Sequence, residues 1–203
     1  MIDDLVLRWI VTGLSALSAA AWGFVVVVRH RSVDEVVRCG LHLVMAVAMA
    51  VMAWPWGAQL PATGPSVFFA LAALWFVASA LVSAETAPLR TVYGYHALMM
   101  LAMAWMYAFV HGLLLPSHSS AHPHVEMDMA EPVVPTGAGS PGWVAAVNGF
   151  WFVGFVASAV FWTSRFRAER PTADGRWRSL TAPAQATMAA AMSIMFGATL
   201  FQA

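Results

Sequence analysis

The sequence contains no lysine, a single cysteine and few charged residues of any kind. Only 10% of its 203 residues are charged, whereas 61% are hydrophobic. So little polar surface cannot cover a water-facing domain, which excludes an ordinary soluble protein. The lone Cys39 excludes an internal disulfide framework. A formal net charge of +0 gives no electrostatic reason to expect nucleic acid as a partner. What remains is the composition of a membrane protein with one domain, residues 1–203.

Long apolar segments are frequent, and their lengths set the expected fold. A bilayer core of roughly 30 Å needs about 20 helical residues. The sequence therefore predicts an all-α, multi-pass membrane protein with transmembrane helices near residues 5–28, 37–54, 66–84, 92–115, 142–164 and 183–202. The first segment is expected to be retained, because Asp3 and Asp4 precede it and Arg29 and Arg31 follow it. A cleaved leader has the opposite order of charge.

Arginine is distributed unevenly among the connections between these segments. Nine of the ten arginines lie in residues 29–38, 85–91 and 165–182, and none lies in 55–65 or 116–141. Basic residues favour the cytoplasmic side of a membrane. The sequence thus predicts a protein of the bacterial plasma membrane, embedded in the lipid bilayer, with both termini outside.

One pattern of side chains occurs in three of the expected helices. Residues 42–52 read HLVMAVAMAVM, residues 96–106 read HALMMLAMAWM, and residues 185–195 read QATMAAAMSIM. Each has a polar residue followed by Met at offsets 3, 7 and 10, which share one helical face. The expected topology makes the three helices parallel. Facing one another, they would form four layers: His42, His96 and Gln185; Met45, Met99 and Met188; Met49, Met103 and Met192; and Met52, Met106 and Met195.

Two interpretations of these stripes compete. The offsets also fit the seam of ordinary helix packing, in which Met fills irregular gaps. A packing seam accepts Leu, Ile, Ala or Gly, however, and here all nine positions are Met. Thioether sulfur is a soft, neutral ligand that suits Cu(I), and the stripes contain no costly buried charge. The stripes therefore predict a Cu(I) site.

The preceding helices contain a weaker repeat. Segments beginning at Trp22, Trp75 and Trp151 resemble one another, and each lies upstream of one stripe. This spacing indicates three helical hairpins derived from one unit and arranged with three-fold pseudosymmetry.

The connection 116–141 is rich in His and Met. Its His-x-His and Met-x-Met elements predict capture of copper outside the membrane, although a solvated loop with incidental His is the alternative. The candidate ligands are His118, His122, His124, Met127 and Met129. His111 is a weaker candidate for a link between this loop and the stripe. Cys39 is a candidate for copper transfer on the cytoplasmic side, or an inert buried thiol.

The Met-x-x-x-Met element recurs as Met45/Met49, Met99/Met103 and Met188/Met192. Together with the outer His/Met loop it resembles the site of Ctr-type copper transporters, which stack Met triads from three subunits. The resemblance implies a Cu(I) path. It covers only the stripes and the loop, because Ctr subunits have three transmembrane helices and a glycine motif that are not matched here. The whole chain is also similar to a family of uncharacterised actinobacterial membrane proteins, known by a domain of unknown function.

The sequence thus predicts a membrane Cu(I)-binding protein that transports, stores or delivers copper. An enzyme is not expected, because the helices contain no acid-base pair, activated nucleophile or phosphate loop. One alternative is a b-type haem with His42 and His96 as axial ligands. Another is an accessory or assembly subunit of a respiratory copper enzyme. Expected partners are the copper ion and a membrane copper enzyme or an extracytoplasmic copper protein.

The arginine distribution makes a prediction about orientation. Reporter fusions at Ala203 and within 55–65 should report the outer side, and a fusion within 165–182 should report the cytoplasm. Paired reporters that are active on opposite sides of the membrane provide the measurement. A cytoplasmic Ala203 would contradict the proposed orientation of the stripes.

Overall fold

The computed structural model describes residues 4–28, 33–82, 87–110, 142–168 and 181–201, and all regular secondary structure in these ranges is helical. No strand occurs in them, so the predicted all-α class is confirmed. The described residues form six α-helices and, directly after the second, a short 3-10 helix that the sequence pattern did not predict. They are α1 (Leu5–Val28), α2 (Val33–Met52), η1 (Pro55–Gln59), α3 (Thr63–Val82), α4 (Ala87–Val110), α5 (Gly142–Ala168) and α6 (Thr181–Phe201).

Five of these helices are long and apolar enough to cross a membrane: α1, α2, α3, α5 and α6. The chain is therefore a multi-pass membrane protein. Helix α4 has 24 residues, which is sufficient length, but its first half carries Arg90, Tyr93, Tyr95 and His96. The last residues predicted for this helix, 111–115, lie outside the described residues.

Several helices are longer than the apolar segments that predicted them. Helix α2 begins at Val33 instead of 37, and Asp34 and Glu35 in its first turn complement the positive end of the helix dipole. Helix α5 continues to Ala168 instead of 164, with Arg165 and Arg167 in its last turn. Hydropathy marks the part of a helix that lies in lipid, whereas these polar turns continue the same helix beyond it.

Prolines define other boundaries. Pro65, Pro88 and Pro183 lie near the first turns of α3, α4 and α6, where a missing N–H is tolerated. These helices begin at 63, 87 and 181, a few residues before the predicted 66, 92 and 183. Helix α2 ends at Met52 instead of 54, because the residue before Pro55 adopts extended backbone.

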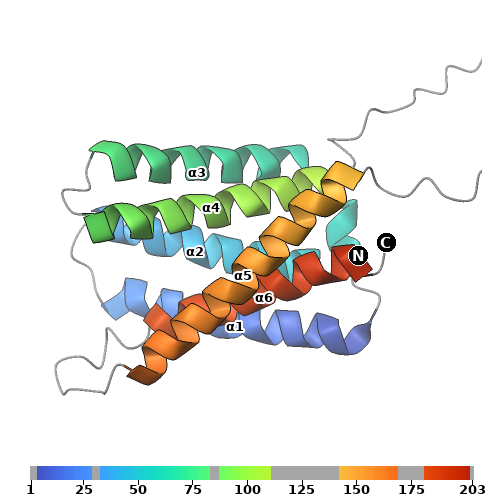
Figure 1. The fold of residues 1–203 in the computed structure, drawn as a ribbon, viewed down its shortest axis with the longest axis horizontal. Coiled ribbons are helices and arrows are strands. Elements are labelled where there is room, and N and C mark those ends of the chain that lie inside the picture. The colour runs from blue at the N-terminus through green and yellow to red at the C-terminus, as the bar shows by residue number, and fades with distance from the viewer. Residues whose placement is uncertain (1–3, 29–32, 83–86, 111–141, 169–180, 202–203) are drawn as a thin grey trace, which may run out of the picture.

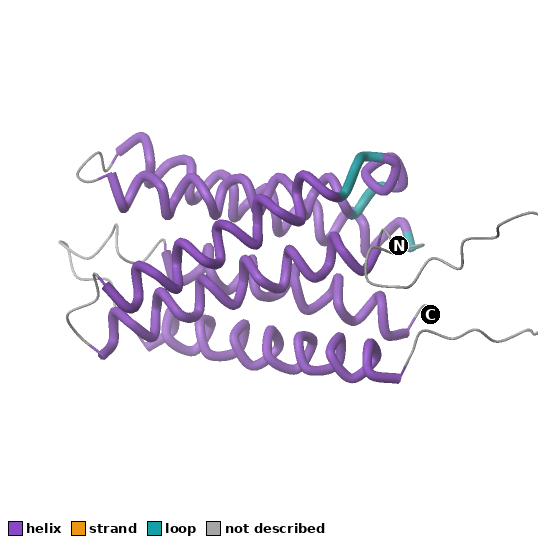
Figure 2. The backbone as a smooth tube through the Cα atoms, turned by 90° about the horizontal axis from the view of Figure 1, so that it is seen from above, coloured by secondary structure: helices purple, strands orange, loops and turns teal. Residues whose placement is uncertain are grey.

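The helices form three antiparallel hairpins, α1/α2, α3/α4 and α5/α6, with a further close approach between α1 and α6. Figure 1 shows that α2, α4 and α6 run in one direction and the other three in the opposite direction, while α5 crosses the bundle diagonally. Figure 2 shows the same elongated bundle from above. Among the described residues, α2/α3 and α4/α5 do not approach each other as closely as α1/α6. The arrangement therefore departs from an even three-fold ring.

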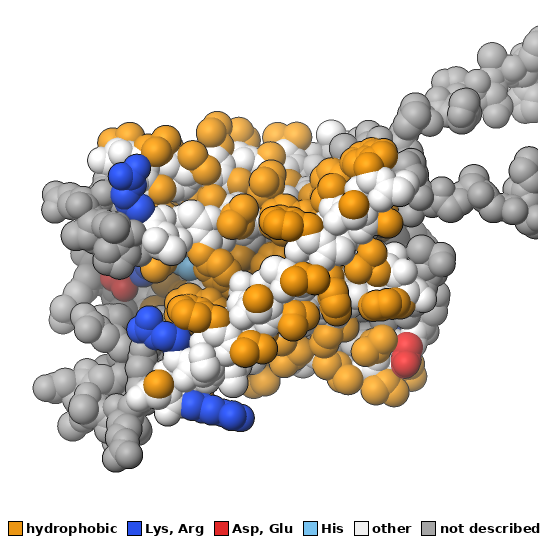
Figure 3. Space-filling model, viewed as in Figure 1, with side chains coloured by type: hydrophobic (Ala, Val, Ile, Leu, Met, Phe, Trp, Pro, Cys, Tyr) orange, Lys and Arg blue, Asp and Glu red, His pale blue; other side chains and the backbone are white. Residues whose placement is uncertain are grey.

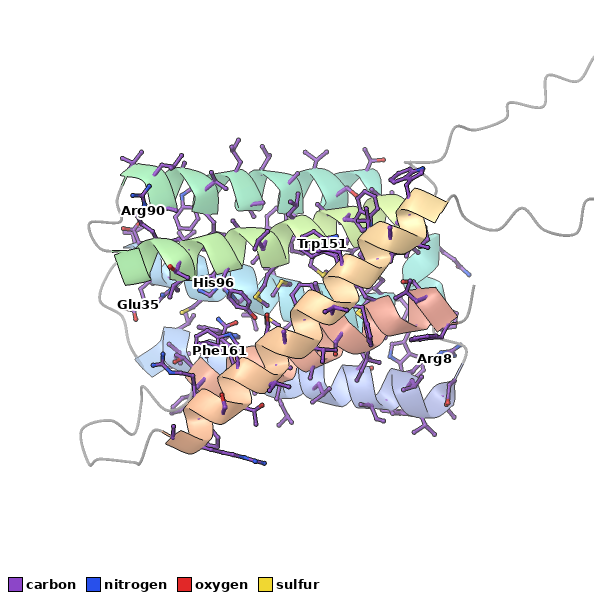
Figure 4. The ribbon with its side chains drawn as sticks, viewed as in Figure 1. Arg8, Glu35, Arg90, His96, Trp151 and Phe161 are labelled. Carbon is purple, nitrogen blue, oxygen red and sulfur yellow. The ribbon has the colours of Figure 1, made fainter. Side chains whose placement is uncertain are left out.

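The two ends of the bundle differ in charge. The start of α1 and the end of α6 lie at one end (Figure 1). The opposite end carries Arg90, Arg165 and Arg167, and its blue side chains are visible in Figure 3. Arg8 lies at the end that holds the start of α1 (Figure 4). Arg90, Arg165 and Arg167 thus mark one end of the described bundle, called the arginine end below.

Hydrogen bonds between side chains and neighbouring helices connect the hairpins. Ser18 donates to the carbonyl of Ala184 at 3.2 Å, which joins α1 to α6. The indole N–H of Trp105 donates to Asn148 Oδ1 at 2.9 Å, which joins α4 to α5. Interhelical bonds of this kind contribute about 0.6–2 kcal/mol each in a membrane. They fix the relative positions of helices whose apolar faces alone would pack in several ways.

The turn after α2 requires glycine at one position. A Cβ at Gly57 would overlap the carbonyl oxygen of Val51 and lie 2.8 Å from its carbonyl carbon. Gly57→Ala should therefore destabilise the protein by about 1–3 kcal/mol, because backbone atoms have to move. Gly64→Ala is the matched control, since nothing lies within 4 Å of a Cβ there. Thermal unfolding in detergent measures both; equal midpoints would contradict the prediction.

Candidate metal site

The three stripes lie in the interior of the bundle. None of their nine Met side chains is more than 6% exposed, and all nine belong to one buried cluster. The outward-facing positions of the same helices instead carry aliphatic side chains, for example Val44 and Leu98. Figure 4 shows sulfur atoms between the helices rather than on the outer surface. The predicted inward orientation of the stripes is therefore what the structure shows.

The two histidines of the stripes contact each other directly. Nε2 of His42 lies 3.2 Å from Nδ1 of His96, and the ring centroids are 4.4 Å apart. His42 is 0% exposed and His96 2% exposed. Because α2 and α4 run in the same direction and their stripes have the same offsets, this contact places corresponding Met residues of the two helices at similar depths.

A backbone carbonyl determines which ring nitrogens carry protons. Nδ1 of His42 lies 2.7 Å from the carbonyl oxygen of Arg38, which accepts but cannot donate a hydrogen bond. His42 Nδ1 therefore carries a proton. In a neutral imidazole its Nε2 then has the lone pair, so His96 Nδ1 must donate the proton shared between the rings. Nε2 of His96 is consequently unprotonated, and its lone pair is not used in the hydrogen bond between the two rings.

Aromatic rings surround the histidine pair. The ring of Trp22 lies 4.6 Å from that of His42, and the ring of Phe76 lies 5.4 Å from that of His96. The other tryptophans of the predicted repeat make different contacts: Trp75 packs against Phe76, and Trp151 packs against aromatic rings of α5 and α6. Trp22 was noticed in the sequence as part of the repeat. No sequence pattern marked Phe76 as a neighbour of the histidines, because it is one hydrophobic residue among many in its helix.

Gln185, the third member of the predicted polar layer, is buried on α6. It is 3% exposed, and its Oε1 has no hydrogen-bond partner among the described residues. An unsatisfied buried polar group costs about 1–3 kcal/mol. Trp22 Nε1 and Ser15 Oγ, both on the buried face of α1, are unsatisfied in the same way. The structure therefore adds α1 to the polar surroundings of the stripes, a contribution that the stripe pattern did not reveal.

Of the remaining predicted ligands, only Cys39 lies within the described residues. Cys39 is buried on α2, one turn before His42 and closer to the arginine end. The candidates of the outer connection, His111, His118, His122, His124, Met127 and Met129, lie outside the described residues. Within the described residues, no three His, Cys, Asp or Glu side chains gather as a metal site. A metal site in this part of the chain would therefore depend on thioethers.

These observations define a multi-pass helical membrane protein whose interior is lined by thioether and imidazole groups. The chain belongs to a family described as "Domain of unknown function (DUF5134)", whose model matches residues 34–199. It is 49% identical to an uncharacterised protein of Mycobacterium bovis and to one of Mycobacterium tuberculosis, over 99% of each chain. These relatives fit the predicted actinobacterial family. No solved structure is significantly similar to the chain.

The histidine pair makes a spectroscopic prediction. In the metal-free protein, His42 and His96 should both be Nδ1–H tautomers, because the Arg38 carbonyl fixes the first and the shared proton fixes the second. NMR of 15N-histidine-labelled protein distinguishes the tautomers. His96→Asn provides the assignment of the His42 signals. An Nε2–H tautomer at His42 would show that the hydrogen bond to Arg38 is absent.

Proposed function

We propose that the protein binds Cu(I) in the interior of the bundle and thereby transports, stores or delivers copper. One observation carries this proposal: nine thioethers and two touching imidazoles share a buried region that contains no charged side chain. The buried polar residues among those described are all neutral types, namely Ser15, Ser18, His42, His96, Asn148, Gln185 and Ser193.

The chemistry of the donors favours a soft monovalent cation. Thioether sulfur binds Cu(I) well, whereas Mg²⁺ and Ca²⁺ prefer oxygen ligands. A divalent ion in an uncharged apolar interior would also lack compensating charge, which is expensive within a membrane. Cu(I) surrounded by neutral thioethers adds one positive charge and requires no buried carboxylate.

The histidine pair adds two imidazole nitrogens at one end of the row of proposed Met ligands. Two nitrogens that are each about 2.0–2.1 Å from one tetrahedral ion lie roughly 3.3 Å apart. The 3.2 Å separation of His42 Nε2 and His96 Nδ1 is close to this value. A metal ion in place of the shared proton would move the His96 proton to Nε2 and leave His42 as an Nδ1–H tautomer. The NMR measurement described above would detect this change on addition of Cu(I).

The compactness of the interior favours stepwise transfer or retention of the ion over an open channel. The Met side chains are almost completely buried, so an ion reaches them only when side chains move. Met has a flexible, unbranched side chain that permits such movement. Stacked ligands at similar depths would let an ion pass from one set of sulfurs to the next.

The orientation and location are part of the same proposal. With the arginine end in the cytoplasm, both termini and the His/Met-rich connection 116–141 lie outside, in the plasma membrane. The histidine layer then lies nearer the cytoplasm, and Met52, Met106 and Met195 lie nearest the outer side. Copper captured outside would meet thioethers first and imidazoles last.

The haem alternative is less consistent with the geometry of the pair. A bis-histidine haem has its iron and macrocycle between the two ring nitrogens, which lie here at hydrogen-bonding distance. Trp22 and Phe76 pack against the same two rings. A role as an accessory subunit of a copper enzyme is compatible with Cu(I) binding and differs in the partner that receives the ion. An absorption spectrum with copper analysis separates the cases, since only haem gives a Soret band.

The middle thioether layer provides the main test. Replacing Met49, Met103 and Met192 together by Leu conserves volume, and each change should cost less than ~1.5 kcal/mol of stability. The variant should fold and lose most Cu(I) binding, because the soft donors are removed. Single variants should show non-additive losses, since the three sulfurs would share one ion. Cu(I) stoichiometry and affinity of the purified proteins provide the measurement.

The chain contains a matched control for this experiment. Met100 is 0% exposed on α4 but lies beside the stripe rather than in it. Met100→Leu should keep both stability and Cu(I) binding. If the folded triple variant binds Cu(I) as the wild type does, the stripes are ordinary packing and the proposal is wrong.

A further inference from the structure

A cavity lies between α4 and α5 at the arginine end of the bundle. Its volume is about 550 Å³, and its lining includes Thr91 and Tyr95 of α4 and Ser158, Phe161, Trp162 and Arg165 of α5. Because α5 crosses the bundle diagonally, it moves away from α4 toward this end (Figure 1). Figure 3 shows the surface hollowed here, with a histidine side chain visible inside the hollow, and Figure 4 labels Phe161 beside it.

The cavity combines an apolar wall with donors for an anion. Phe161 and Trp162 form the wall, with the Trp162 ring 6.0 Å from that of Tyr95. The Tyr95 hydroxyl is buried, and the side chains of Trp162 and Ser158 lie beside it without forming a hydrogen bond of normal geometry. Ser158 donates to the carbonyl of Gly154 at 2.8 Å, and the lining also contains the guanidinium of Arg165 and the phenol of Tyr95.

The charge around the cavity is one-sided. Among the described residues, its lining contains Arg165 and no acidic side chain. Asp34 and Glu35 lie in the first turn of α2 and are not among the described lining residues; Glu35 lies 3.9 Å from Arg38. An occupant with negatively charged oxygens would form charge-assisted hydrogen bonds with Arg165. The apolar wall would at the same time contact a hydrocarbon portion of that occupant.

We propose that this groove binds an anionic phospholipid, with the phosphate at Arg165 and Tyr95 and an acyl chain along the α4/α5 wall. The proposal does not depend on copper binding. The groove belongs to helices surrounded by lipid, so a lipid reaches it without leaving the bilayer. Basic pockets between transmembrane helices on the cytoplasmic side are suited to anionic headgroups. Aromatic side chains such as Trp162 and Tyr95 are favoured at headgroup depth.

The other side of α5 provides an internal control. A second cavity of about 470 Å³ is lined by residues of α1, α5 and α6 and includes Arg167, two residues from Arg165. Its hydroxyl groups on Thr163 and Thr187 donate to carbonyls of their own helices. Among the described residues, its lining contains no aromatic side chain. Arg167 therefore matches Arg165 in charge and approximate depth but lacks the aromatic wall and the tyrosine hydroxyl.

Native mass spectrometry of the full chain tests the proposal with phosphatidylglycerol and phosphatidylcholine as probes. The wild type should retain phosphatidylglycerol in preference to phosphatidylcholine. Arg165→Gln should lower the affinity for phosphatidylglycerol about five-fold, and Tyr95→Phe should also lower it. Arg167→Gln should leave it unchanged. Thermal unfolding with and without each lipid provides a second readout, in which only phosphatidylglycerol should stabilise the wild type.

Three outcomes would overturn the proposal. Equal losses in Arg165→Gln and Arg167→Gln would indicate general attraction to surface charge. Equal retention of the two lipids would indicate an apolar groove without headgroup recognition. Displacement of the lipid by millimolar inorganic phosphate would indicate a site for a free anion. If Arg165→Gln does not fold, Tyr95→Phe carries the test, and unchanged lipid selectivity in that variant would contradict the proposal.

Discussion

The hydrogen bond between His42 and His96 joins two helices that belong to different hairpins. Since α2 and α4 run in the same direction, this contact sets the position of one stripe relative to the other along the bundle axis. The Arg38 carbonyl orients His42, and Trp22 and Phe76 pack against the rings. A shift of one helix by a single turn would break the contact and move each Met away from its counterpart. The order of the Met interior therefore depends on a pair of imidazoles.

The same interior shows how a membrane protein can place soft donor atoms at its centre without burying charge. Apolar side chains provide no driving force between helices in lipid, so close packing and interhelical hydrogen bonds determine the assembly. A Met side chain fills space between helices as a hydrocarbon does, and it also carries a soft donor atom. Gln185 Oε1 and Trp22 Nε1 lack partners among the described residues. A cation or a water could satisfy the Gln185 oxygen, whereas only an acceptor such as water could satisfy the Trp22 N–H.

The diagonal course of α5 connects the interior with the surface. At the arginine end it leaves a groove against α4, and Tyr95 in this groove is the neighbour of His96, with ring centroids 5.8 Å apart. At the other end it is joined to α4 by the bond between Trp105 and Asn148. Helix α5 is thus hydrogen-bonded to α4 near one end and separated from it by a groove near the other. The groove lies beside the histidine pair, where a bound lipid would be adjacent to the polar layer.

The fold class and the faces of the stripes followed from the sequence, because hydropathy and helical periodicity act locally along the chain. Met49 and Met103 were expected inside from their spacing alone, and both are 0% exposed. The polar first turn of α2 at Asp34 and Glu35 was missed, since hydropathy stops at the edge of the lipid although the helix continues. The contact of His42 with His96, the packing of Trp22 and Phe76 against them, and the burial of Ser15, Ser18 and Asn148 depend on tertiary structure. They require helices distant in sequence to meet at a particular depth and rotation, and interhelical packing, rather than any local pattern, determines both.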